Sequence, residues 1–103
     1  MIVATEKLGT DKDFADTLKT LLAQLPPPGI ISADGRIQEW LEDYKEADPQ
    51  HRHVSHLWGL FPASLITPAG TPELAAAAKK TLDVRGDDGP SWSIAYKQIF
   101  WAR

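Results

Sequence analysis

The sequence contains no cysteine, and it has only three histidines in its 103 residues. The absence of cysteine excludes disulfides and thiolate metal sites, although it does not decide the cellular compartment, so localisation stays open. No stretch approaches the roughly 18 apolar residues of a membrane-spanning helix, and the first residues lack the apolar run of a signal peptide. The net charge of −3 includes no long run of one sign. We therefore expect neither a nucleic-acid partner nor a membrane partner.

Hydrophobic residues make up 43% of the chain, which is enough for one modest core at this length. We therefore expect a single domain over residues 1–103. Apolar residues at steps of three and four predict a helix over residues 10–25, with Thr10 as its N-cap and the proline-rich residues 26–29 as its end. Residues 30–32 predict a short extended piece and Asp34-Gly35 a turn, whereas the ambiguous period of residues 36–44 fits a brief strand or a helical turn; we predict an irregular segment there.

Three further segments carry helix signals. A serine that can act as a cap precedes helical spacing in residues 55–61. A threonine cap, a proline and an acid open an alanine-rich run over residues 71–84. Residues 91–103 predict a last helix, capped by Ser91 or Ser93. The fold class is therefore mainly α, with about three to four helices joined by structured loops.

All three histidines lie in one segment, HRHVSH at residues 51–56. His51 and His53 would point the same way on an extended chain, and His56 could complete a metal site. However, Arg52 would lie beside the cation and no His-Glu-x-x-His motif is present, so we expect no metal site. We also set aside a Ser55–His56 dyad, because adjacent residues rarely present their side chains to each other. For each histidine, capping a helix or bonding a loop carbonyl remains an alternative.

A carboxylate and a tryptophan stand together upstream, at Glu39 and Trp40. Tryptophan faces stack on sugars, and a neighbouring carboxylate accepts hydrogen bonds from their hydroxyl groups. This pair therefore predicts a sugar-binding surface. Tryptophan at helical spacing is more often buried, so we expect Trp58 and Trp101 in the core. Trp92 follows a loop, and we expect it to face the surface.

Four motifs occur together in the second part of the chain. They are GRIQEWLED at residues 35–43, HRHVSHLWGLFP at residues 51–62, TPEL at residues 71–74, and RGD at residues 85–87 followed by Trp92-Ser93. In this order and with these gaps they resemble a segment of the family 95 glycoside hydrolases, from about residue 26 to residue 103. Those enzymes are chiefly inverting α-L-fucosidases, and some act on α-L-galactosides. The resemblance implies an (α/α)6 toroid in the parent enzyme, of which this chain would form part.

The resemblance implies binding residues here, and no catalytic ones. The general-acid glutamate of the family lies in an upstream Ser-Pro-Glu type motif, and the asparagines and aspartate that activate water lie in other segments. This sequence has none of those motifs. The matching pairs, Arg52-His53 and Glu39-Trp40, belong to the sugar-contacting surroundings in the family. His56 and Trp92 complete the expected substrate-binding set, and no cofactor is expected.

Our leading hypothesis is a fragment of an α-L-fucosidase-like glycoside hydrolase that is inactive as an isolated chain. The expected partner of the intact parent is an L-fucosyl or related glycan. Family members are often exported, so the parent could be periplasmic or secreted. The alternative is a non-catalytic helical module that binds carbohydrate or another partner, and the flanking DNA would distinguish the two.

The C-terminal segment also predicts self-association. Its large apolar residues fall on more than one side of a helix: Ile94, Tyr96, Ile99, Phe100 and Trp101. A piece cut from a toroid exposes apolar area that the missing helices would cover. We therefore expect a two-fold homodimer in which these helices pack or exchange between chains.

Overall fold

The computed structural model describes residues 1–103 and is mainly helical, as predicted. The elements in chain order are α1 (Ile2–Leu8), α2 (Lys12–Leu22), the 3₁₀ helix η1 (Ser55–Gly59), α3 (Pro72–Arg85) and α4 (Ser91–Trp101). The structure contains no β-strand, and a single isolated bridge joins Ile31 to Ile37 across the predicted irregular segment. None of the helices combines the length and the apolar character that crossing a bilayer requires.

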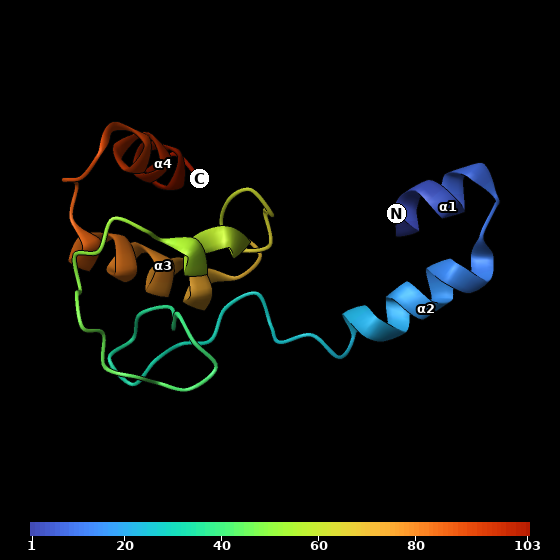
Figure 1. Cartoon of the computed structure of the whole chain (residues 1–103), viewed down its shortest axis with the longest axis horizontal. Helices are drawn as coiled ribbons and strands as arrows, with labels where there is room; N and C mark the ends of the chain where they lie inside the picture. Colours follow the sequence, from blue (N-terminus) through green and yellow to red (C-terminus); the bar gives the residue numbers. More distant parts are fainter.

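The first two helices form a hairpin that stands apart from the rest of the chain (Figure 1). Gly9 makes the turn with a φ of 68°, a left-handed value that glycine adopts without strain. The sequence patterns did not predict α1. They did predict α2, but it begins at Lys12 and its N-cap is Asp11, so the assignment of Thr10 as the cap is wrong. No hydrogen bond or ion pair joins residues 1–25 to residues 26–103.

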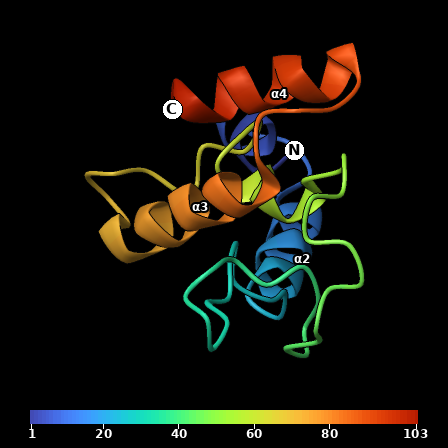
Figure 2. The same cartoon turned by 90° about the vertical axis from the view of Figure 1, so that its left-hand side faces the viewer.

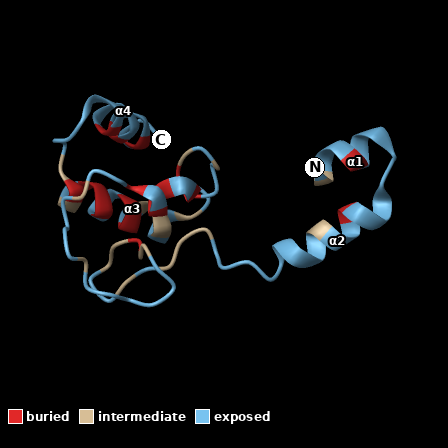
Figure 3. Cartoon of the chain, in the orientation of Figure 1, coloured by how far each residue is buried: buried red, intermediate tan, exposed pale blue.

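The remaining residues form one packed body around α3. In both views α3 lies between α4 on one side and the turns of residues 31–47 on the other (Figure 1 and Figure 2). Buried residues concentrate on α3, η1 and one side of α4, whereas the hairpin is mostly exposed (Figure 3). The core comprises Ile37, Val54, Leu57, Leu60, Ile66, Ala77, Ala78, Leu82 and Phe100.

The start of α3 follows the sequence signal, although the threonine acts differently. Thr71 is the N-cap residue and Pro72 opens the helix, as predicted. The Thr71 hydroxyl makes no cap bond; instead it accepts the Thr67 N–H at 2.9 Å and closes the preceding turn. Proline at the first helical position has no N–H to satisfy, so the helix tolerates this arrangement.

The start of α4 differs from the prediction. Its N-cap is Pro90, and neither Ser91 nor Ser93 caps the helix. The Ser93 hydroxyl points instead to a loop of the body, where it donates to the Arg52 carbonyl.

The tryptophans are more exposed than their helical spacing predicted. Trp58 and Trp101 are 50% and 44% exposed, close to the 43% of Trp92. The core prediction is therefore wrong for Trp58 and Trp101, while Trp92 faces the surface as predicted. The physical reason is that η1 and α4 each pack on one side only, so rings on their other sides stay in solvent. The Lys79 ammonium lies 5.4 Å from the centre of the Trp101 ring and partly covers it.

Candidate functional site

The histidine segment leads from a loop into η1, and its aromatic rings meet α4. The rings of His51 and His53 stack with their centres 5.2 Å apart. The His53 N–H donates to His51 Nδ1 at 3.2 Å, so this nitrogen of His51 acts as an acceptor. The His53 ring also lies 5.0 Å from the ring of Trp92, centre to centre. Two of the predicted residues, His53 and Trp92, therefore lie side by side.

His53 and Trp92 line a cleft of about 440 Å³, which we call the aromatic cleft. Its lining residues are His53, Val54, Ser55, Trp58, Phe61, Pro62, Trp92, Tyr96 and Phe100. The rings of Phe61 and Phe100 meet edge to face, with their centres 6.4 Å apart. The wall is thus mostly apolar and aromatic, with an imidazole at its edge, which suits a ligand that has both an apolar face and hydroxyl groups.

A second cleft, of about 290 Å³, lies along the proline run, and we call it the proline cleft. Its lining residues are Pro26, Pro27, Pro28, Gly29, Ile30, Gln38, Glu39, Trp40, Leu41, Ser55, His56 and Trp58. Glu39, Trp40 and His56 belong to this cleft and not to the aromatic cleft. Because Trp58 lines both clefts, the two are neighbours, and they divide the predicted site residues between them.

Arg52 lies next to the aromatic cleft with its side chain in solvent. No hydrogen bond or ion pair engages its guanidinium group, whereas its backbone carbonyl accepts the Ser93 hydroxyl at 2.7 Å. The backbone of Arg52 is therefore held while its five N–H donors remain available to a ligand.

Glu39, in contrast, already has a protein partner. Its carboxylate lies 3.2 Å from Nη2 of Arg85, a residue whose side chain is almost completely buried. Trp40 beside it is mostly exposed. One oxygen of the Glu39 carboxylate is therefore paired with Arg85, and the other has no partner. Glu39 lines the proline cleft.

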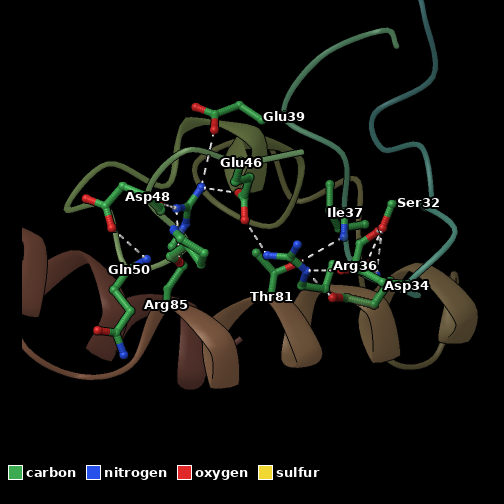
Figure 4. Close-up of polar contacts among 12 residues, drawn as sticks. Ser32, Asp34, Arg36, Ile37, Glu39, Glu46, Asp48, Gln50, Thr81 and Arg85 are labelled. Atoms are coloured by element: carbon green, nitrogen blue, oxygen red, sulfur yellow. Dashed lines mark hydrogen bonds and ion pairs between the residues drawn. The ribbon is translucent and has the colours of Figure 1, made fainter. Parts of the chain in front are cut away.

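Arg85, at the end of α3, is the centre of a polar network that the sequence did not reveal (Figure 4). Its Nη1 donates to the carbonyls of Asp48 and Pro49 at 3.0 and 3.1 Å. Its Nη2 lies 2.7 Å from the Glu46 carboxylate, whose other oxygen pairs with Arg36. A basic residue in the last turn of a helix is ordinary, because it offsets the helix dipole, so no sequence signal pointed to this role.

His56 is buried, and charged groups of this network act on its ring. Neither of its ring nitrogens has a hydrogen-bond partner. Burial, and next the charge of Arg85, lower the pKa of His56 to about 4. The ring is therefore neutral at pH 7 and can offer one donor and one acceptor, although it reaches the proline cleft with little exposed surface.

Carboxylates are scarce in both clefts. Hydrolysis of a glycosidic bond needs two carboxyl groups on opposite sides of the sugar. No carboxylate lines the aromatic cleft, and Glu39 is the only one that lines the proline cleft. No group of three or more histidine or carboxylate side chains is arranged to hold a metal ion.

Comparison with known proteins also points to glycoside hydrolases. The family model described as "Glycosyl hydrolase family 95 catalytic domain" matches residues 1–103. Alpha-L-fucosidase 2 of Arabidopsis thaliana is 48% identical over 106 aligned residues, which cover 100% of this chain and 12% of that protein. Probable alpha-fucosidase A of Aspergillus niger is 29% identical over 98 residues, covering 89% of this chain and 12% of that protein.

The chain thus spans 12% of the length of these two relatives. The match over all 103 residues confirms the resemblance carried by the four motifs and extends it to the α1–α2 hairpin. A mainly helical structure agrees with a partial helical toroid. This chain belongs to glycosyl hydrolase family 95, as a segment of its catalytic domain.

Proposed function

We propose that this chain is part of an α-L-fucosidase-like catalytic domain, to which it contributes sugar-binding loops and no catalytic carboxylate. The observation that carries the proposal is the aromatic cleft, lined by His53 and Trp92. Arg52 precedes His53 in the chain, and its guanidinium is exposed and unpaired. The names of the relatives support α-L-fucosides as the substrate class. Residues 1–103 then form one partial domain of the toroid.

An L-fucosyl group suits this surface chemically. The sugar has a methyl group and C–H faces, which pack against aromatic rings, and hydroxyl groups, which need donors and acceptors. Trp92 supplies a ring face, while Arg52 and His53 supply the polar partners. They would bind the sugar, and residues outside this chain would protonate the leaving group and activate water.

The proline cleft would extend the binding surface. Glu39 has an acceptor oxygen there and Trp40 an exposed ring. His56 lines this cleft, but its unpaired ring nitrogens are buried, so it would contact the sugar mainly through the ring. All six residues therefore serve binding in this proposal.

Sugar binding by the chain can be measured from its tryptophans. Each of the four indole N–H groups gives its own signal in a ¹H–¹⁵N spectrum. Added L-fucose at millimolar concentration should shift the Trp92 and Trp58 signals and leave Trp101, which lines a separate groove between α3 and α4, unchanged. Arg52→Met should weaken the response roughly tenfold, because a charge-assisted hydrogen bond is lost. Equal shifts with D-glucose, or none with L-fucose, would contradict the proposal.

The absence of catalysis is tested separately. The chain alone should not hydrolyse an aryl α-L-fucoside, because neither cleft holds an acid and a base together. Turnover that survives purification controls and disappears in Glu39→Gln would overturn this part. The coding DNA on either side of the segment should encode the missing acid and base motifs; an isolated reading frame would favour the non-catalytic module instead.

A further inference from the structure

Two polar side chains lie on the inner side of α4, where apolar residues would be expected. Ser93 is 0% and Lys97 2% exposed. They are four residues apart, so they lie on the same face of the helix, and Phe100 continues that face into the core. A buried hydroxyl or ammonium group is costly unless it is hydrogen-bonded, so the bonds that these two groups make are strongly preferred.

Each of them bonds to the backbone of a different loop. The Ser93 hydroxyl donates to the Arg52 carbonyl at 2.7 Å. The Lys97 ammonium donates to the Asp88 carbonyl at 2.7 Å, in the loop that leads into α4. If either loop moved, its buried partner on α4 would be left unpaired, so both loops are tied to the helix.

The loop that carries Arg52 is also tied at its other end. Arg85 holds the carbonyls of Asp48 and Pro49 from the end of α3. The backbone of residues 48–52 is therefore attached to α3 at one end and to Ser93 of α4 at the other. These attachments use main-chain carbonyls, so the Arg52 guanidinium remains free.

The same attachment sets the position of His53 against Trp92. Trp92 precedes Ser93 in α4, and His53 follows Arg52 in the loop, so the Ser93–Arg52 bond lies directly beside the ring pair. The bond from the His53 N–H to His51 Nδ1 orders the loop internally but does not link it to α4. The Ser93 hydroxyl thus makes the hydrogen bond that links the backbone next to His53 to α4.

We propose that Ser93 is a positioning residue that holds Arg52 and His53 against Trp92, and so pre-organises the aromatic cleft for its sugar. The inference rests on the proposed function for the identity of the ligand. Ser93 is fully buried and acts only through the Arg52 carbonyl. Pre-organisation matters because a mobile loop would have to be ordered when the ligand binds, which lowers affinity.

The experiment compares Ser93→Ala with Ser91→Ala in the full chain. Ser91 is in the same first turn of α4 but is exposed, and it makes no side-chain hydrogen bond, so it is a matched control. The first readout needs no ligand: the proton signals of the His53 ring, which the Trp92 ring 5.0 Å away should shift from their usual position. The second readout is the L-fucose titration of the Trp92 indole signal, and thermal melting reports the fold.

In Ser93→Ala we expect the His53 ring signals to move towards those of an unstructured histidine, with a cooperative melt retained. L-fucose binding should weaken roughly threefold to tenfold, as for the loss of one buried hydrogen bond. Ser91→Ala should match the parent chain, and Ser93→Thr, which keeps the hydroxyl, should restore the His53 signals. Unchanged His53 signals in Ser93→Ala would overturn the proposal.

Two further measurements cover the cases in which Ser93→Ala does not fold or the parent chain does not bind L-fucose. If Ser93→Ala does not fold, Ser93→Cys takes its place, because a thiol has similar size but is only a weak donor. Parent-like His53 signals in that variant would equally overturn the proposal. If the parent chain shows no response to L-fucose, the proposed function fails, whereas the His53 signals still decide whether Ser93 positions the loop.

Discussion

At the scale of single residues, Arg85 is the side chain on which most of the polar structure depends. It binds two carboxylates and two carbonyls while almost fully buried. A planar guanidinium group can serve several acceptors in fixed directions, whereas an ammonium group is a point charge on a flexible stem. Its removal would leave Glu46 and Glu39 without their shared cation.

Arg85→Lys should therefore lower the free energy of unfolding by about 2–4 kcal/mol, because buried acceptors lose their partners. Urea unfolding, followed by tryptophan fluorescence, measures the change. Arg52→Lys is the matched control: the Arg52 side chain is exposed and unpaired, so its replacement should alter stability by less than about 0.5 kcal/mol. Equal stability of both variants would show that the network contributes little.

His56 gives the chain a pH-dependent stability with a definite sign. The pKa of its buried ring is lowered to about 4, chiefly by burial, so between about pH 4 and pH 6.5 the unfolded chain binds more protons at this position than the folded chain. Stability should therefore fall as the pH drops through this window, with a slope from this group of at most about 1.4 kcal/mol per pH unit. The charged groups that act on the ring are Arg85, Glu46 and Arg36.

Urea unfolding at several pH values between 5 and 7 tests this prediction against His56→Leu, which cannot titrate. The difference between the two proteins isolates His56 from every other group. As the pH falls, we expect the free energy of unfolding of the parent chain to decrease relative to that of His56→Leu. Parallel stability curves would mean that the imidazole does not remain neutral in the folded chain.

At the scale of elements, we expect the hairpin and the body to be independent. Apart from their chain connection, no hydrogen bond or ion pair links residues 1–25 to the remainder, and the apolar face of α2 is largely exposed. The periodicity of α2 predicted the helix correctly because local spacing decides which face is apolar. It could not predict that most of that face stays exposed in this chain.

Ala15 is the buried contact residue of α2, so Ala15→Glu should open the hairpin without disturbing the body. We expect a loss of helical circular dichroism at 222 nm, a general marker of helix, with unchanged fluorescence, because all four tryptophans lie in the body. Ala4→Glu, at an exposed position of α1, should leave both signals as they are. A fluorescence change in Ala15→Glu would show that hairpin and body are coupled.

At the scale of the whole molecule, α4 remains the clearest candidate for contact with a second chain. Large apolar residues stay partly exposed on more than one side of it, namely Ile94, Tyr96, Ile99 and Trp101. Exposed apolar area of this kind is lost from water when two chains pack together. Phe100 is the exception, because it is buried in the core and cannot take part.

We expect light scattering at tens of micromolar to give about twice the chain mass of 11.4 kDa, if two α4 helices pack across a two-fold axis. Trp101→Lys should shift the mass towards the monomer, since it places a charge on the contact surface. Glu73→Lys, an exposed change at the start of α3, is the control and should not. A monomer mass for the parent chain at every concentration would contradict the prediction.

The sequence by itself determined the helices of the body, the helical class of the fold and the family. These depend on short-range features: apolar spacing, the Thr71-Pro72 start, and motifs that are read directly from residue order. It also placed His53 and Trp92 in the expected binding set, and that assignment remains a prediction.

Only the tertiary structure decided which groups pair. The carbonyl and carboxylate partners of Arg85 lie 36 to 46 residues away, and Ser93 bonds a carbonyl 41 residues away. No local pattern encodes such pairs, because each depends on how α3, α4 and the loops pack. The same holds for Trp58 and Trp101: burial depends on how far other elements cover the ring, and here both rings stay about half exposed.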